Sequence, residues 1–142
     1  MAATAAATDI GYMTTVGKVV GTVYTPFAEL FDIIPPEQAR DSIDFTHFTS
    51  PDAAREFKPG LSDHGEVGIA YNLIPGVADD AVILTHLSSR IVEAWRITFP
   101  NGAKLDWRGF ATGHGRAVPM EDKMTGSATF KVSGKPTMTP AV

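Results

Sequence analysis

An unbroken alternation of polar residues with apolar or small residues runs through positions 123–132 of the chain. The odd positions carry lysine, threonine or serine, and the even positions carry methionine, glycine, alanine, phenylalanine or valine. A period of two residues is typical of a β-strand, because successive side chains of a strand point to opposite faces of the sheet. One face of this strand should therefore meet water and the other a packed core. We predict a mainly β fold built from strands of this kind.

Further stretches with the same period lie between frequent turn residues, since the 142 residues include 13 glycines and 10 prolines. Residues 67–73 place large apolar side chains on one face and small or polar ones on the other. Residues 43–47 alternate in the same way, so His47 continues an apolar face and is expected to be a hydrogen-bonded core histidine. The other predicted strands cover residues 16–24, 27–34 and 109–118.

A β-hairpin is predicted over residues 95–107, where the tripeptide Pro-Asn-Gly at 100–102 separates two alternating runs. A two-residue turn would place the apolar side chains of one strand opposite the charged face of the other, which is the wrong register. A three-residue loop corrects this, with Gly102 in a left-handed bulge position. The predicted cross-strand pairs are Ile97 with Leu105, Trp95 with Trp107, and the oppositely charged Arg96 with Asp106.

One segment, Ala78–Ser89, has the period of an α-helix. Ala81, Leu84 and Leu87 form an apolar stripe, which we expect to face the sheet. Aspartates at 79 and 80 begin the helix and Arg90 follows its end, which complements the helix dipole. His86 is expected at the surface or half-buried. A single helix of about three turns should cover one face or one open end of the sheet.

The remaining segments have no regular period. Residues 49–64 contain two prolines, a glycine and scattered apolar residues, and we expect a long functional loop there. Residues 1–15 are expected to be a flexible N-terminal arm, and residues 133–142 an extended C-terminal tail. No repeat or linker divides the chain, so we expect one domain over residues 1–142.

Composition argues against several functions. The net charge is −4 and the basic residues are scattered, which is unlike a nucleic-acid-binding domain. There are no cysteines, and the four histidines (47, 64, 86 and 114) have no metal-binding spacing. Gly113-His114-Gly115 lacks the further glycine of a phosphate loop, so we expect these glycines to permit a bend or a close backbone approach within a strand. We predict no enzyme, no metal or cofactor, and neither a signal peptide nor a membrane span at the N-terminus.

The order of motifs between residues 95 and 138 is more informative. It runs Arg-Ile-Thr-Phe-Pro-Asn-Gly at 96–102, Trp-Arg-Gly-Phe at 107–110, the long alternating strand, and Gly-Lys-Pro-Thr-Met at 134–138. This order resembles the N-terminal domain of lambda-type tail tube proteins of long-tailed bacteriophages. The resemblance covers about a third of the chain at the level of motifs. The lambda protein continues into an immunoglobulin-like domain after this point, so no surface-decorating role is expected of this chain.

The resemblance implies a β-sandwich or barrel-like fold flanked by one helix. It further implies that copies form rings, by expectation hexameric, which stack into a hollow tail tube. The expected location is the virion tail, after synthesis in the bacterial cytoplasm. Other tail proteins (a tape measure, an initiator, a terminator) are expected partners, and DNA would pass without specific binding. An acidic protein would not hold passing DNA.

Candidate self-assembly residues follow from these expectations. The 49–64 segment is expected to contact the next ring, and the strands at 108–118 and 123–132 to build the tube wall. The candidates are Arg55, Phe57, Lys58, Leu61 and Asp63 in the first segment, and Arg108, Arg116, Lys123 and Lys131 in the strands.

Two other functions remain open from the sequence. The first is a monomeric β-barrel that binds a small apolar ligand in an interior lined by Trp95, Trp107 and Phe130. The second is a small enzyme that uses His64 or His114 with nearby carboxylates. A deep apolar cavity in a stable monomer would favour the first, and loss of an activity on mutation of either histidine would favour the second.

Overall fold

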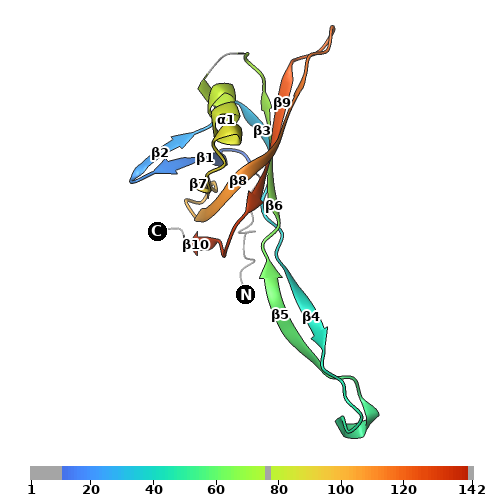
Figure 1. Cartoon of the computed structure of the whole chain (residues 1–142). Coiled ribbons are helices and arrows are strands. Elements are labelled where there is room, and N and C mark those ends of the chain that lie inside the picture. Colours follow the sequence, from blue (N-terminus) through green and yellow to red (C-terminus); the bar gives the residue numbers. More distant parts are fainter. Residues whose placement is uncertain (1–10, 76–77, 141–142) are drawn as a thin grey trace, which may run out of the picture.

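The computed structural model describes residues 11–75 and 78–140, which form ten β-strands, one α-helix and a short 3-10 helix (Figure 1). The predicted mainly β fold is confirmed. The strands are β1 (Thr15–Val20), β2 (Val23–Pro26), β3 (Leu30–Ile34), β4 (Ala39–Asp44), β5 (Phe57–Asp63), β6 (Glu66–Asn72), β7 (Glu93–Thr98), β8 (Lys104–Ala117), β9 (Thr125–Val132) and β10 (Thr137–Thr139); the helices are η1 (Pro51–Ala53) and α1 (Ala78–Ser89).

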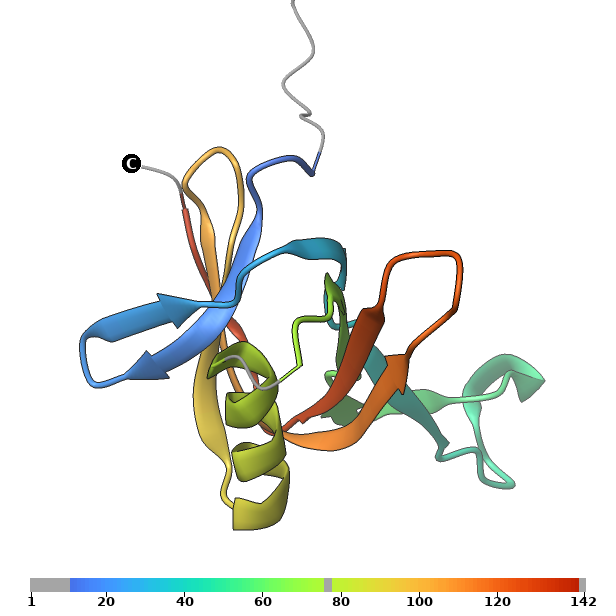
Figure 2. The same ribbon diagram turned by 90° about the horizontal axis from the view of Figure 1, so that it is seen from above.

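One antiparallel sheet makes up the body of the molecule. Its strand order is β2-β1-β7-β8-β9-β6-β3, and β10 is added beside the start of β8. The 14-residue strand β8 belongs to both halves of the sheet, because residues 104–109 pair with β7 and residues 109–117 pair with β9. The sheet curls so that its two halves enclose the core, as the view from above shows (Figure 2). The expected sandwich or barrel-like architecture is therefore confirmed.

The core is centred on three aromatic side chains. The Trp95 ring lies 4.8 Å from that of Phe130 and 5.9 Å from that of Trp107, between centroids. All three are buried, as are the even positions of β9 from Gly126 to Val132. The alternation seen in the sequence therefore marks the side of β9 that faces the core.

The predicted hairpin has the predicted register. Trp95 lies opposite Trp107, and Ile97 opposite Leu105. Arg96 Nε donates a hydrogen bond of 2.7 Å to Asp106 Oδ1. The turn residue Gly102 has a φ of +92°, which is the left-handed conformation that the three-residue loop requires.

Helix α1 has the predicted bounds, but the predicted buried stripe is wrong. Leu84 and Leu87 are partly exposed, while Ile83 and His86 face the sheet and are buried. His86 Nε2 accepts a hydrogen bond of 3.0 Å from the backbone N–H of Ala111. The His86 ring therefore faces the sheet, at a position where a prediction from hydrophobicity alone would place a leucine.

Two segments differ from the predicted strand pattern near the N-terminus. Residues 16–24 form two strands rather than one, because Gly21 adopts a φ of +61° in a tight turn between β1 and β2. Strand β3 begins at Leu30 rather than at residue 27. Residues 1–10 of the expected arm lie outside the described residues, and within the expected C-terminal tail β10 pairs with β8.

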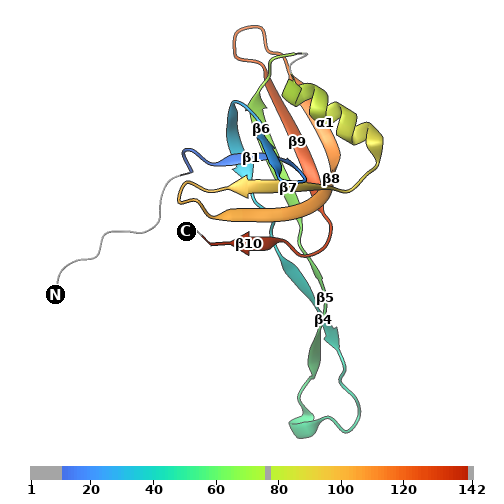
Figure 3. The same ribbon diagram turned by 90° about the vertical axis from the view of Figure 1, so that its left-hand side faces the viewer.

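The expected long loop at 49–64 is also corrected, because its residues 57–63 are the β5 strand of a two-stranded β4–β5 hairpin. This hairpin projects away from the body in two perpendicular views (Figures 1 and 3). Every residue of β4 is exposed, and Phe45 and His47 just beyond it are exposed as well. His47 is therefore not a core histidine: a lone hairpin has no second layer to bury one face.

Two glycines of β8 provide a matched test of the close packing in this strand. A Cβ at Gly109 would collide with the backbone oxygen of Lys131, whereas a Cβ at Gly113 would meet no atom within 4 Å. We expect Gly109→Ala to lower the free energy of unfolding by about 1–3 kcal/mol, because the opposing atom is backbone that cannot move aside. Gly113→Ala should change it little. Chemical denaturation of both variants measures the difference, and equal effects would contradict the assigned packing.

Candidate self-assembly surfaces

The β4–β5 hairpin exposes both of the apolar side chains predicted for ring contact. Phe57 is 56% exposed and Leu61 is 87% exposed, although both lie in a strand. Phe48 at the tip is fully exposed, and sequence analysis did not single it out. The signal available in the sequence was the position of this phenylalanine directly before the predicted loop at 49–64.

Hydrogen bonds within the hairpin give its tip a defined shape. Glu56 Oε2 accepts a bond of 2.7 Å from the Ser50 hydroxyl and lies 3.3 Å from His47 Nε2. The side chain and backbone N–H of Thr46 donate to Asp44, which lowers the pKa of that carboxyl below its ordinary value. The tip is thus held by its own polar contacts, which leaves the aromatic rings outward.

An ion pair fixes the base of the hairpin to the main sheet. Lys131 Nζ on β9 lies 2.9 Å from Asp63 Oδ1 at the end of β5. The hydrogen bond from Lys131, followed by that from the Gly65 backbone N–H, lowers the pKa of Asp63. Of the nine predicted self-assembly residues, these two are brought into direct contact.

The other predicted charges do not form one cluster. Lys58 Nζ lies 4.9 Å from the Phe45 ring centre, within the hairpin. Lys123 Nζ lies 4.2 Å from the Phe31 ring centre, at the other end of the sheet. Arg55, Arg108 and Arg116 are exposed at separate places: before β5, in the first half of β8, and in its second half.

Strand edges form a second kind of surface. Among the described residues, β3 pairs only with β6, and residues 110–117 of β8 pair with a strand only on the β9 side. An unpaired edge presents a row of backbone donors and acceptors and is a template for another strand. These two edges bound the four-stranded part of the sheet in the order β8-β9-β6-β3.

The face of this four-stranded part that points away from the core carries mostly small and polar side chains, with Ile34 and Phe110 as the exposed apolar ones at its edges. Gly68 lies opposite Thr129, and Ala70 lies opposite Ser127. The neighbouring positions of β8 on this face are glycine and alanine, at 113, 115 and 117. The register of β8 shifts between Ala111 and Gly113, so a strand irregularity lies beside the glycines for which a bend or a close backbone approach was predicted.

A partly buried chain of polar side chains lies under the helix, on the other side of β8. His86 Nε2 accepts a hydrogen bond from the Ala111 N–H, and the other ring nitrogen, Nδ1, lies 2.8 Å from Glu93 Oε2. Lys18 Nζ lies 3.0 Å from the same carboxylate oxygen. No period in the sequence marks this network. It joins α1, β1, β7 and β8 and so supports the second half of β8 from behind.

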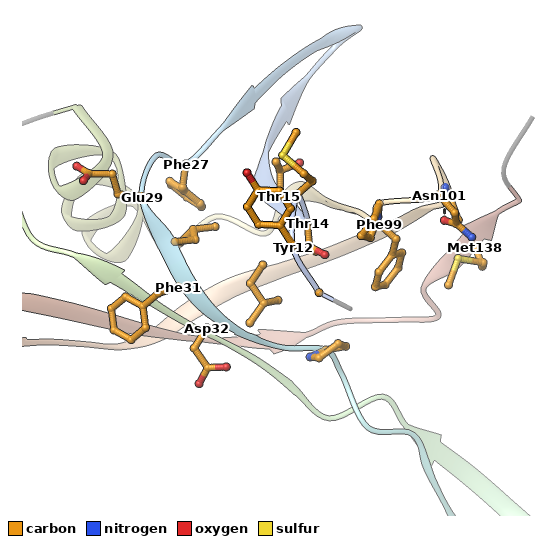
Figure 4. A pocket seen from close by; sticks show the side chains of 17 residues that line it. Tyr12, Thr14, Thr15, Phe27, Glu29, Phe31, Asp32, Phe99, Asn101 and Met138 are labelled. Atoms are coloured by element: carbon orange, nitrogen blue, oxygen red, sulfur yellow. Dashed lines mark hydrogen bonds between the residues drawn. The ribbon is translucent and has the colours of Figure 1, made fainter. Parts of the chain in front are cut away.

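A cleft of about 1020 Å³ lies beside the free edge of β3. Phe31 and Asp32 of β3 form one wall, Phe99 and Asn101 of the β7–β8 turn form the other, and Tyr12 lies between them (Figure 4). The three aromatic residues proposed to line a ligand cavity are instead packed against one another in the core. The cleft is therefore separate from the interior that a ligand-binding barrel would use.

Chemistry-bearing clusters are scarce in the same residue ranges. Over residues 11–75 and 78–140, no group of three or more His, Asp or Glu side chains is arranged to hold a metal ion. His114 Nε2 lies 2.7 Å from the Tyr71 hydroxyl, and His64 Nε2 lies 3.3 Å from the Ser62 hydroxyl. In the part of the chain that is described, no helix is long and apolar enough to cross a membrane.

Substitution of Lys131 tests the attachment of the hairpin. In Lys131→Met the donor is lost, so the pKa of Asp63 should rise toward its ordinary value, while the pKa of Asp44 should stay lowered by Thr46. Because the folded pKa of Asp63 is depressed, its stabilising contribution in the wild type is present above the unfolded pKa and is lost as the pH falls through the folded value. Carboxyl NMR titration measures both groups. An unchanged Asp63 titration would contradict the assigned ion pair.

Comparison with known proteins places this geometry in a family. The model of a family described as lambda phage tail tube protein matches residues 8–139. No curated protein sequence matches the chain. A chain of the virion of a native gene transfer agent particle is similar in structure, with a TM-score of 0.75 and 14% identity over 94% of this chain and 100% of that chain.

Two further solved structures have the same fold. A chain in the tail of an empty gene transfer agent particle, determined with C6 symmetry, has a TM-score of 0.77 and 12% identity over 94% of this chain and 100% of that chain. The SPP1 tail tube chain has a TM-score of 0.66 and 12% identity over 88% of this chain and 74% of that chain. At these identities the structures show the fold, and the family model, which spans nearly the whole sequence, shows the family. The chain belongs to the lambda phage tail tube protein family and is a structural component of a virion tail.

Proposed function

We propose that copies of this chain join edge to edge into a closed ring, and that stacked rings form the wall of a hollow tail tube. The observation that carries this proposal is that β3 and the second half of β8, on opposite sides of one four-stranded sheet, each have an edge that pairs with no strand among the described residues. On the β8 edge, the Ala111 N–H is bonded to His86. Pairing the β3 edge of one copy with the β8 edge of the next would continue the sheet around the ring. Closure would leave neither of these two edges exposed, which removes the hazard of uncontrolled strand pairing there.

Six copies in each ring are supported by the C6 symmetry with which the gene transfer agent tail was determined. The cleft beside β3 would lie at the junction between neighbours, because β3 forms one of its walls. Its half-exposed Phe31 would then be covered by the adjoining copy. Burial of apolar surface of this kind is the main driving force of association.

The small-residue face of the four-stranded sheet is the proposed lining of the bore. Gly68, Ala70 and Ser127 leave the backbone close to the surface, which would keep the channel wide. Glu66 lies opposite Lys131 on the same face, and the Lys131 ammonium is paired with Asp63. With the net charge of −4, this lining would let DNA pass without binding it tightly.

The β4–β5 hairpin is the proposed contact with the adjoining ring. It extends beyond the body of the subunit, and its exposed Phe57 and Leu61 lie beside charged residues such as Arg55 and Lys58. A rim of charges around apolar side chains is typical of a protein interface. The proposed role is structural rather than catalytic. Other tail proteins, at the two ends of the tube, are the proposed further partners.

Blocking one edge of the sheet tests ring closure. Phe31→Lys places an ammonium on β3, where pairing with a neighbour would desolvate it next to Lys123. We expect this variant to stay monomeric under conditions in which the wild type forms rings. The matched control is Val23→Lys, which adds the same charge at an exposed valine of β2 and should leave ring formation intact.

Mass-calibrated size-exclusion chromatography over a concentration series, with negative-stain microscopy of each fraction, distinguishes these states. Rings formed by Phe31→Lys would show that β3 is not a closing edge. A wild-type chain that stays monomeric at every concentration would contradict the ring itself.

A further inference from the structure

Strands β5, β6 and β9 run along the length of the molecule, and a different turn lies at each end of them. Strand β5 leads through Gly65 into β6, and β6 pairs along its whole length with β9, which begins at the β8–β9 turn. The β4–β5 hairpin lies at one end of this line and the β8–β9 turn at the other, in two perpendicular views (Figures 1 and 3). Stacking of subunits along the strands would therefore bring the two turns together.

The β8–β9 turn, residues 118–124, is apolar and acidic. Met120 is 94% exposed, and Val118 is exposed beside it. Glu121 and Asp122 follow and are exposed as well. The one lysine of this turn has its ammonium over the Phe31 ring of β3, so the two carboxylates dominate the charge at the outer end. We call this surface the acidic turn.

The tip of the β4–β5 hairpin, residues 45–58, is aromatic and offers two cations. Phe48 is fully exposed, with Phe45 and Phe57 half-exposed near it. Arg55 makes no ion pair within residues 11–75 and 78–140, and Lys58 has only an aromatic partner. We call this surface the aromatic tip.

The carboxylates of the aromatic tip are mostly engaged within it. Asp44, at its base, accepts from Thr46, and Glu56 accepts from Ser50 beside His47. Asp52 is the remaining carboxylate. The cations Arg55 and Lys58 are therefore the groups available to an acidic partner.

We propose that the aromatic tip of a subunit in one ring docks on the acidic turn of a subunit in the next ring. Met120 would lie against the phenylalanine rings, a contact that sulfur and aromatic groups favour. Glu121 and Asp122 would pair with Arg55 and Lys58. The proposal rests on the stacked rings described above and identifies the surface that receives the hairpin.

The docking has a direction. The two surfaces differ, so the contact is heterologous: it joins the end of one subunit to the opposite end of the next and leaves a free surface of each kind. Such a contact repeats without closing. A symmetric pairing of two hairpins would instead stop after two rings.

Reversal of the charges at each end, separately and together, tests the docking. One variant carries Glu121→Lys with Asp122→Lys, a second carries Arg55→Glu with Lys58→Glu, and a third carries all four changes. The matched control reverses two exposed lysines far from both ends, Lys104→Glu with Lys135→Glu. Thermal unfolding of every variant checks that the subunit is intact, and negative-stain microscopy counts rings and measures tube length.

Each two-residue end variant should form rings but shorten the tubes at least tenfold, because like charges then face each other. The four-residue variant should restore long tubes, and the control should resemble the wild type. End variants that stack normally, or a four-residue variant that stacks no better than they do, would overturn the docking while leaving the rings in place. Loss of rings in every sample, including the wild type, would instead overturn the proposed ring and the docking with it.

Discussion

The shared use of β8 by two halves of the sheet is the constraint on which this fold depends. Its first six residues pair with β7 and its later residues with β9, so the strand must bend between them without losing its place in either half. Gly109 allows the backbone of Lys131 to approach closely at the crossing point, and a bulge follows at Ala111 to Gly113. The His86 ring satisfies the backbone N–H that the bend leaves without a strand partner. The bend brings the two halves of the sheet together around the core, places α1 against Ala111, and leaves one edge of the second half of β8 without a strand partner.

Local chemistry made some elements predictable. The register of the 95–107 hairpin could be predicted residue by residue, because only one loop length places Trp95 opposite Trp107 and Arg96 opposite Asp106. The inward face of β9 followed from its alternation. Helix α1 was found by its period, but its buried face was not, because His86 is inward for a hydrogen bond to a strand far away in the sequence. Such a contact depends on tertiary structure and leaves no periodic signal.

The β5 strand was missed for a related physical reason. It contains Pro59 and Gly60, both poor strand formers, and nearly all of its residues are exposed. A strand without a buried face has no reason to alternate, so its sequence resembles a loop. The contact of Asp63 with Lys131 joins residues 68 positions apart, and neither residue type predicts the other. The apolar and charged residues of the hairpin were still recognised as a candidate surface, because their exposure did not require the correct secondary structure.

The slender shape of the β4–β5 hairpin has a consequence for growth. A two-stranded projection offers little area, so a single hairpin meeting a single subunit would hold only weakly. A closed ring presents several hairpins on one rim in fixed positions, and each contact made raises the effective concentration of the others. Free subunits would then add poorly to a tube end, whereas a complete circle of them would be retained. Elongation would be cooperative, with a complete ring as the unit that is added. A preformed platform with the same symmetry would remove the lag before the first ring forms.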